Sequence, residues 1–344
     1  MKYVHGGDIY TYEGLMDFSV NINPLGPDKK VVEAAKEALD HMEHYPDSRC
    51  TKLRECLSDA ISLPQEMLIF GNGAADLIFS LVLAKKPKRA MIVVPAFAEY
   101  EQALKTVECE ICYYRLQEKD NFYLTEKVLD ELSEDLDMVF LCSPGNPCGA
   151  VIQKELLKKI LTKCEEENIQ MMLDECFWEF AYDDIEKTMQ SEISGSKNLF
   201  LLRAFTKMHA IPGLRLGFGI SSDGELLDRM ERVRQPWSVS TPAQEAGIAA
   251  LSEPGRVKKT REYLDGERRW MEGELTRLGI RYYPSEANYL LLYSEKDLFG
   301  MLMEKGFLIR DCGNYRGLSK GYYRIAIRTR RENQMLVKAL EEIV

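Results

Sequence analysis

The chain lacks any apolar run long enough to span a bilayer, and it has fewer basic than acidic residues. Lys and Arg number 45 against 55 Asp and Glu among 344 residues, which gives a formal net charge of −10. Because nucleic acids and anionic membranes attract positive surfaces, this balance argues against either as the main partner. Residues 1–8 also lack the apolar core of a secretion signal, so we expect neither a leader nor a membrane anchor.

Disulfide frameworks and metal-ligand spacings are absent as well. The nine cysteines are odd in number and irregularly spaced, which is typical of reduced thiols in a cytoplasmic protein. Cys109 and Cys112 have C-x-x-C spacing, but they lie in an expected strand, where positions three apart face opposite sides. No second C-x-x-C completes a zinc site, and the four histidines are not spaced as ligands. We therefore predict core cysteines and no metal.

What the sequence does contain is an alternation of short apolar runs and helical patterns from about residue 50 to residue 220. The helical stretches include Ala75–Ala84 and Lys154–Glu167. Such alternation predicts an α/β fold with a largely parallel sheet that is covered on both faces. The expected strands are Met67–Gly71, Ala90–Val94, Glu110–Arg115, Asp137–Cys142, Ile169–Leu173, Leu199–Arg203 and Leu214–Ile220.

The last third of the chain has a different pattern. Ser240-Thr241-Pro242 is a helix start signal, and a long, highly charged helical region follows to about Leu278, long enough to bridge two domains. Strands expected near Ala287–Tyr293, Phe307–Arg310 and Tyr322–Arg328 then indicate a small α+β domain. A chain of this length suits a large domain and a smaller one. We expect an N-terminal arm and part of the small domain in 1–40, the large domain in 41–240, and the linker helix with the small domain in 241–344.

Lys207 is the residue most suggestive of chemistry. It closes a mostly apolar segment, a break at Pro212-Gly213 follows, and Arg215 stands eight residues further on. A buried lysine beside another cation has a lowered amine pKa, which makes it a usable Schiff-base nucleophile. A lone lysine at a strand end is more often a solvated surface residue, so this hypothesis depends on the other segments.

Three further segments follow expected strands. The small residues Gly73-Ala74-Ala75 open a helix whose backbone N–H groups could close around a phosphate, although Asp76 replaces the last glycine of a dinucleotide fingerprint. Asn146 stands at a strand end, where open α/β sheets bind ligands. Asp174 ends an apolar strand and could keep a pyridine nitrogen protonated. Each segment could also be an ordinary turn or helix cap.

Taken in order, these segments resemble the fold-type I pyridoxal-phosphate enzymes of the class I/II aminotransferase superfamily, over essentially the whole chain. The resemblance implies an aspartate aminotransferase-like fold, in which a large domain with a mostly parallel seven-stranded sheet carries a small α+β domain. It also implies pyridoxal 5'-phosphate as the cofactor and a homodimer whose active site is shared across the interface.

The resemblance assigns roles residue by residue. Lys207 would bind the cofactor aldehyde covalently, and Asp174 would pair with the pyridine nitrogen. Asn146 would bond the ring hydroxyl oxygen, and Phe97 would stack on the ring. The cofactor phosphate would be held by Gly73, Ala74, Ala75, Thr206 and Arg215, with Tyr45 reaching in from the neighbouring subunit. Ala204 is a departure, since the family usually has Ser or Thr there, and one lost hydroxyl contact to an ionised group costs about 1.5–3 kcal/mol.

Within the superfamily the chain is most similar to the branch of histidinol-phosphate aminotransferases and threonine-phosphate decarboxylases. His5-Gly6-Gly7-Asp8 looks like the N-terminal arm of the decarboxylases, which belong to cobalamin biosynthesis, and segments 17–26 and 310–318 resemble theirs too. Phe177 stands where most aminotransferases have tyrosine. The decarboxylases convert L-threonine O-3-phosphate into (R)-1-amino-2-propanol O-2-phosphate. The implied residues for this small phosphorylated amino-acid substrate are His5, Asn23, Asn146, Arg310 and Arg324.

Two alternatives stay open. The chain could transfer the amino group of histidinol phosphate or of another amino acid with an anionic side chain. It could also be a non-catalytic binding protein on the same scaffold, although the joint presence of Lys207, Asp174, Asn146 and Arg215 argues against this. His5 could be an inert terminal residue, and Arg310 and Arg316 could form a solvated cationic face.

Overall fold

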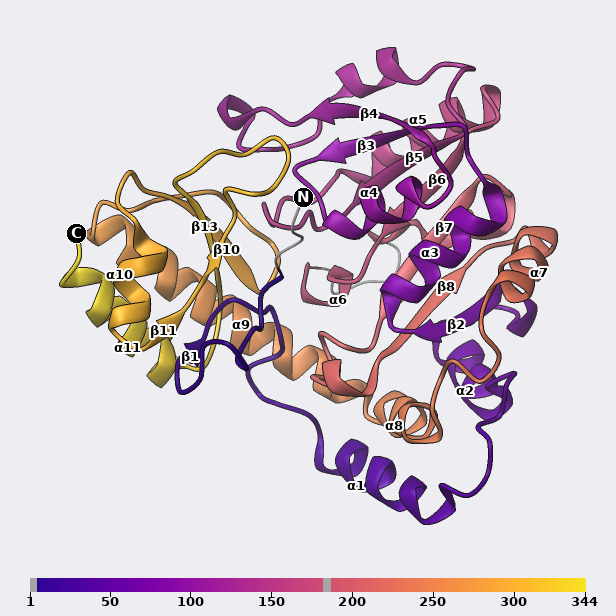
Figure 1. Cartoon of the computed structure of the whole chain (residues 1–344), viewed down its shortest axis with the longest axis horizontal. Helices are drawn as coiled ribbons and strands as arrows, with labels where there is room; N and C mark the ends of the chain where they lie inside the picture. Colours follow the sequence, from indigo (N-terminus) through magenta and orange to yellow (C-terminus); the bar gives the residue numbers. More distant parts are fainter. Residues whose placement is uncertain (1–4, 182–186) are drawn as a thin grey trace.

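Seven short apolar segments pair into one sheet in the computed structural model, which describes residues 5–181 and 187–344 (Figure 1). The strand order is β2-β8-β7-β6-β5-β3-β4, and only β8 runs antiparallel to its neighbours. The predicted, mostly parallel sheet is therefore confirmed, with strand ends within two residues of those expected. The strands are β2 (Leu68–Asn72), β3 (Arg89–Val94), β4 (Glu110–Arg115), β5 (Met138–Cys142), β6 (Gln170–Asp174), β7 (Leu199–Ala204) and β8 (Leu216–Ile220).

Helices cover both faces of this sheet. Successive residues of β6, Met171 and Met172, belong to apolar clusters on opposite faces, because side chains alternate along a strand. One cluster includes residues of α3, α4 and α7, and the other includes residues of α2, α5 and α8. The helices of this larger unit are α1 (Lys29–Glu37), α2 (Thr51–Ile61), α3 (Ala74–Lys85), α4 (Ala98–Lys105), α5 (Lys154–Glu166), α6 (Trp178–Ala181), α7 (Gly224–Val233) and α8 (Thr241–Leu251).

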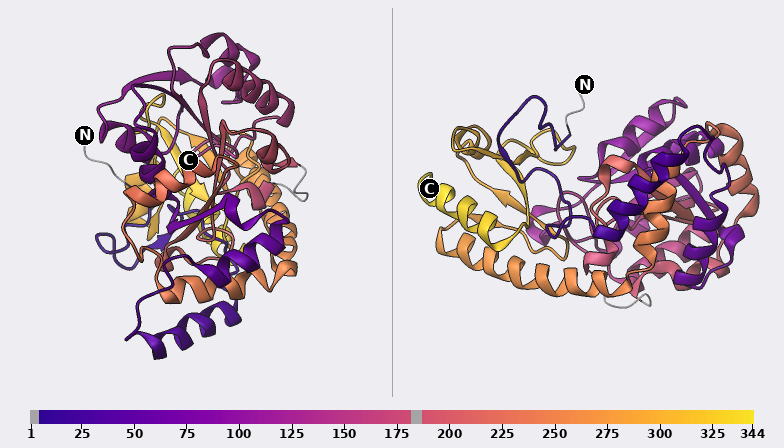
Figure 2. Two further views of the ribbon diagram at one scale, coloured as in Figure 1. Left: turned by 90° about the vertical axis from the view of Figure 1, so that its right-hand side faces the viewer. Right: turned by 90° about the horizontal axis from the view of Figure 1, so that it is seen from below.

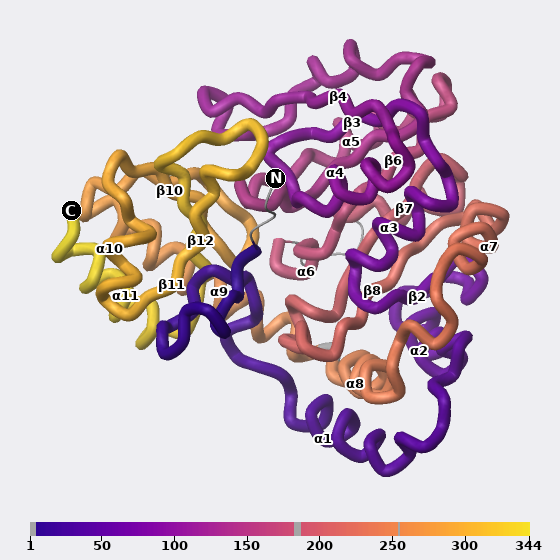
Figure 3. The backbone as a smooth tube through the Cα atoms, in the orientation of Figure 1, coloured from indigo at the N-terminus to yellow at the C-terminus, as the bar shows by residue number. Residues whose placement is uncertain are grey.

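A smaller unit lies beside the large one and, apart from the indigo β1, is drawn in orange and yellow in Figure 3. It has an antiparallel sheet in the order β12-β13-β10-β9, and β1 pairs with β11. Its core contains Leu290, Ile325 and Leu336. The elements are β1 (Met16–Asp17), α9 (Pro254–Arg277), β9 (Arg281–Tyr282), β10 (Tyr289–Tyr293), α10 (Leu298–Glu304), β11 (Phe307–Leu308), β12 (Arg310–Asp311), β13 (Tyr322–Ala326) and α11 (Arg330–Glu341).

The charged region expected as one helix up to Leu278 is in fact two helices. α8 ends at Leu251 and α9 begins at Pro254. Proline has no N–H to donate and fits the first turn of a helix better than its interior, so the chain starts a new helix there. α9 then spans both units (Figure 2) and contacts both α6 and α11.

The expected strand Phe307–Arg310 is also divided. Residues up to Leu308 pair with β1, whereas Arg310 and Asp311 pair with β13, and Ile309 lies between the two strands. The N-terminal segment thus joins the smaller unit through β1 before α1 packs along α8 of the larger one. The domain boundaries at 40 and 240 remain predictions.

Across residues 5–181 and 187–344, none of the helices combines the length and the apolar character that a bilayer crossing needs.

Candidate active site between the two units

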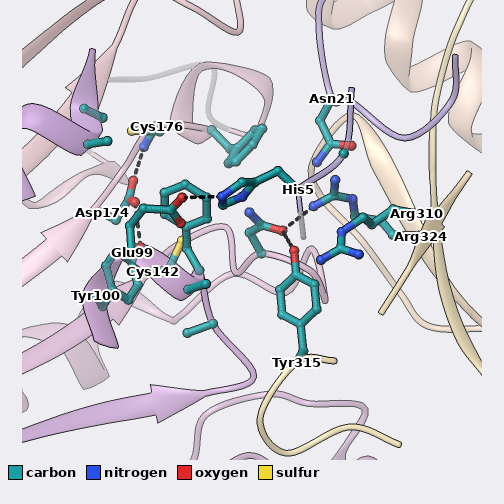
Figure 4. Close-up of a pocket in the computed structure, with 18 of the residues that line it drawn as sticks. His5, Asn21, Glu99, Tyr100, Cys142, Asp174, Cys176, Arg310, Tyr315 and Arg324 are labelled. Carbon is teal, nitrogen blue, oxygen red and sulfur yellow. Dashed lines mark hydrogen bonds and ion pairs between the residues drawn. The ribbon is translucent and has the colours of Figure 1, made fainter. Parts of the chain in front are cut away.

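A cavity of about 410 Å³ lies between the units and is lined by residues of both. Asn146, Asp174 and Lys207 line it from the segments that end β5, β6 and β7, and Arg310 and Arg324 line it from β12 and β13. Figure 4 shows the acidic residues on one side and the arginines on the other. A cavity of this size suits a cofactor or a small substrate.

Lys207 follows the end of β7, and its ammonium form is disfavoured. Burial, together with the nearby Arg324 and Arg215 guanidinium groups, lowers the pKa of Lys207 to about 8. Its Nζ lies 5.8 Å from the centroid of the Phe177 ring. An amine that loses its proton near neutral pH is the form that attacks a carbonyl carbon.

Asp174 is the last residue of β6, and it is buried. The Tyr100 hydroxyl donates a hydrogen bond to its Oδ2 at 2.6 Å, and the Cys176 N–H donates to Oδ1 at 2.9 Å (Figure 4). Burial raises the pKa of Asp174, and these hydrogen bonds oppose the increase only in part. Such a carboxylate gains most from a cationic partner, such as a protonated ring nitrogen.

The start of α3 and Arg215 form a cradle suited to an anion. Gly73 has a φ of +80°, and a Cβ there would lie 2.2 Å from Nη2 of Arg215. A Cβ on Gly217 would lie 2.5 Å from the backbone nitrogen of Ala74. Glycine at both positions therefore lets the helix N-terminus and the guanidinium approach each other, an arrangement that binds phosphate. Ala74, Ala75 and Arg215 line the cavity, whereas Gly73, which precedes Ala74 in the chain, is not among the lining residues.

These features fit pyridoxal phosphate: the cradle suits its phosphate, the buried Asp174 suits its ring nitrogen, and Lys207 suits its aldehyde. Phe97 and Thr206 line the same cavity. Ala204 also lines it, so the departure noted in the sequence faces the site.

The side chains of Asn146 and Arg324 form a hydrogen bond with each other. Oδ1 of Asn146 accepts hydrogen bonds from Arg324 Nη1 and, at 3.5 Å, from the Tyr315 hydroxyl. Arg324 also donates to the Ser19 carbonyl at 2.7 Å. Because these donors use the amide oxygen, the NH2 group of Asn146 is the one able to donate to a ligand.

His5 lies at the cavity and contacts Glu99. Their Nε2 and Oε1 atoms are 3.3 Å apart. Burial, followed by the charge of Arg310, lowers the pKa of His5. Burial raises the pKa of Glu99 to about 7. Each shift favours the uncharged form of its group.

Three predicted residues lie outside the cavity lining, namely Gly73, Asn23 and Tyr45. Asn23 is buried, and its Nδ2 donates to the Met208 carbonyl at 2.8 Å and to Thr260 Oγ1 at 2.9 Å, so its amide is not available to a substrate. Asn21 lines the cavity instead. Tyr45 is 79% exposed and stacks on Trp237, with ring centroids 4.6 Å apart. Its contact with a neighbouring subunit remains a prediction.

Sequence reasoning did not assign a role to several polar lining residues, among them Asn21, Glu99, Tyr100 and Tyr315. A signal existed for Tyr100, which follows Phe97 by three residues and so lies about one helical turn away. Tyr315 lies inside segment 310–318, which resembles the corresponding segment of the decarboxylases.

Comparison with known proteins gives the family. The model for class I and II aminotransferases matches residues 13–340. The threonine-phosphate decarboxylase of Salmonella typhimurium is 39% identical over 352 residues, covering 99% of this chain and 96% of that protein. The solved histidinol-phosphate aminotransferase from Clostridium acetobutylicum has a TM-score of 0.90 at 29% identity, covering 96% of this chain and 99% of its own. L-threonine-O-3-phosphate decarboxylase from Porphyromonas gingivalis has a TM-score of 0.82 at 27% identity, covering 95% and 98%.

The expected aspartate aminotransferase-like fold is thereby confirmed. Membership of this family implies pyridoxal phosphate as the cofactor. With the match extending over almost the whole sequence, the chain belongs to the class I and II aminotransferase family, on the branch that includes threonine-phosphate decarboxylases and histidinol-phosphate aminotransferases.

Proposed function

We propose that the protein binds pyridoxal phosphate and decarboxylates L-threonine O-3-phosphate to (R)-1-amino-2-propanol O-2-phosphate, as in cobalamin biosynthesis. The observation that carries the proposal is one cavity that holds Lys207 and Asp174 opposite Arg310 and Arg324. The 39% identity to a threonine-phosphate decarboxylase supports the same reaction.

In this proposal the chain's own groups hold the cofactor at several points. Lys207 binds its aldehyde, Asp174 keeps its ring nitrogen protonated, and Asn146 donates to its ring oxygen. Its phosphate is held by Ala74, Ala75, Thr206 and Arg215 beside Gly73, and Phe97 stacks on its ring. When bound, pyridoxal phosphate supplies an electron sink for the pair released at the substrate Cα.

The substrate carries two anionic groups, and the cavity offers cations to both. Arg310, Arg324 and His5 bind the phosphate and the carboxylate, and Asn21 contributes an amide. Because bidentate arginine contacts fix direction as well as charge, they would orient the carboxylate for its loss as CO2. The bond from Cα to the carboxylate would then break, CO2 would leave, and Lys207, set free when the substrate amine takes its place on the aldehyde, would donate a proton to Cα. A pKa of about 8 keeps both forms of Lys207 populated near neutral pH.

Aminotransfer from histidinol phosphate is the second candidate, favoured by the TM-score of 0.90 to an aminotransferase of that type. Histidinol phosphate has no carboxylate on Cα. The 2-oxo acid that accepts the amino group does carry a carboxylate, so Arg310 and Arg324 suit either reaction and the products must separate them.

Product analysis separates the two reactions. Purified protein supplied with cofactor and O-phosphothreonine should release CO2 and aminopropanol phosphate without any added 2-oxo acid. A keto product that requires a 2-oxo acid would instead establish the aminotransferase. O-phosphoserine is the comparison substrate, since one methyl group in an apolar pocket changes kcat/KM by only about 10–200-fold. A visible absorbance band that borohydride abolishes tests covalent attachment of the cofactor to Lys207.

We also propose a homodimer in the cytoplasm, with Tyr45 reaching the cofactor phosphate of the partner. The exposed apolar side chains of Leu39, Met42, Tyr45 and Trp237 support an interface. All nine cysteines are free thiols, which suits a reducing compartment. Sedimentation at micromolar concentration tests the dimer, and Tyr45→Ala should weaken cofactor retention.

A further inference from the structure

Asn314, Tyr315 and Arg316 are consecutive residues in the loop between β12 and β13, and each contacts other residues that line the cavity. Asn314 Oδ1 accepts a hydrogen bond from Arg310 Nη2 at 2.9 Å. The Tyr315 ring centroid lies 5.2 Å from the Arg310 guanidinium, and the Tyr315 hydroxyl points to Asn146 (Figure 4). Arg316 pairs with Glu101. The loop thus connects a substrate-binding candidate, Arg310, to two residues of the larger unit.

The pair between Arg316 and Glu101 is a two-point contact across the units. Nε of Arg316 lies 3.1 Å from Oε2 of Glu101, and Nη2 lies 3.0 Å from Oε1. Glu101 belongs to α4, and only 12% of its side chain is exposed. The guanidinium also lies 4.2 Å from the centroid of the Tyr113 ring in β4. Arginine's planar fork allows this geometry, which a lysine ammonium cannot reproduce.

Glu101 stays ionised in this arrangement. Burial acts to raise its pKa, but hydrogen bonds from Arg316 and Lys105 outweigh burial and lower the pKa to about 2. Glu101 is therefore ionised at every physiological pH, so the ion pair with Arg316 across the units does not depend on pH in that range.

We propose that Arg316 is a positioning residue for the substrate phosphate. The inference rests on the proposed function and deepens it. By binding Glu101, Arg316 holds the loop in place, and the loop residues Asn314 and Tyr315 then hold Arg310 directed into the cavity. A loop that is already ordered spares the substrate the entropy cost of ordering it. The class of ligand selected in this way is an amino acid with a phosphomonoester side chain.

Arg316 also lines the cavity, so direct contact with the phosphate is the competing role. The two roles make opposite predictions for Glu101→Gln. If Arg316 acts by holding the loop, removal of the Glu101 charge loosens the loop and weakens phosphate binding. If Arg316 touches the phosphate itself, the same substitution releases its guanidinium and leaves binding unchanged or tighter.

The test compares Arg316→Lys, Glu101→Gln and the double variant as holoenzymes. The matched control is Arg277→Lys, which alters an exposed pair with Glu341 on the smaller unit. Both single variants should raise the KM for O-phosphothreonine, and the calorimetric Kd for inorganic phosphate, about tenfold. kcat and the cofactor absorbance band should stay within about twofold of wild type, because no group that touches the reacting atoms changes. The double variant should be no worse than either single one, since both remove the same contact.

Glu101→Gln with unchanged or tighter phosphate binding would overturn the inference, and so would a double variant whose losses add. Loss of kcat and of the absorbance band together with the change in KM would indicate general damage and would also overturn it. A wild-type enzyme with no preference for O-phosphothreonine over threonine contradicts the proposed function itself. That failure is seen before any variant is made.

Discussion

A Cβ atom at Gly73 would lie 2.2 Å from Nη2 of Arg215, closer than real Cβ atoms approach any neighbour. We predict that Gly73→Ala displaces the guanidinium and strains a backbone with a φ of +80°. The apparent Kd for pyridoxal phosphate, measured by absorbance titration, should rise about tenfold or more. Gly266→Ala in α9 is the control, because its Cβ meets open space, and unchanged affinity in both variants would contradict the cradle.

Lys207→Met should stabilise the cofactor-free protein below pH 8. The pKa of Lys207 falls from 10.5 to about 8 on folding. Between those values the unfolded chain binds more protons than the folded one, so the stability of the wild type rises with pH across this window. The advantage of the variant should therefore be largest below pH 8 and should fade towards pH 10.5. Thermal unfolding across this range measures it, and a difference independent of pH would exclude a charge effect.

Tyr100→Phe should weaken catalysis through Asp174. The variant removes the hydroxyl that donates to Oδ2 of Asp174 at 2.6 Å. A hydrogen bond to a charged group contributes about 1.5–3 kcal/mol, so kcat should fall at least about tenfold. Tyr293→Phe, in β10, is the control for loss of a tyrosine hydroxyl. If Tyr100→Phe keeps full activity at neutral pH, this hydrogen bond does not support the ionised carboxylate.

Arg203→Met should strongly destabilise the fold. Arg203 is 1% exposed, and its Nη2 lies 2.7 Å from Oε2 of Glu175, the residue after Asp174. Removal of one partner leaves a buried charge without compensation, which costs about 3–5 kcal/mol. Lys36→Met breaks an exposed pair with Glu33 and should change the free energy of unfolding by less than about 1 kcal/mol. Urea unfolding of the two variants makes the comparison, and equal losses would contradict the burial argument.

The sequence predicts the strands of the large sheet well, because most of them are compact apolar runs with both faces buried, whereas β4 at the sheet edge is only partly buried. It does not predict that β8 is antiparallel, since an apolar run carries no direction. Pro254 is a local signal for the break between α8 and α9, but the charged helical pattern around it favoured a single helix.

The sequence also predicts some residues of the candidate site and not others. Asp174 and Lys207 follow strand ends, where chain order alone indicates a common edge. The exclusion of Asn23 depends on Thr260, 237 residues away in the chain, and on the Met208 carbonyl. Asn21 and Asn23 are too similar in local sequence to be told apart without those tertiary partners.

A hydrogen bond joins Asn146, which is proposed to bind the cofactor, to Arg324, which is proposed to bind the substrate. In the proposed complex, an incoming anion that drew the guanidinium of Arg324 towards itself would alter the amide of Asn146, which is proposed to donate to the cofactor ring. Thermodynamic reciprocity then requires that cofactor and substrate change each other's affinity by the same factor. The proposed function thus implies that cofactor binding and substrate binding are coupled through the carboxamide of Asn146.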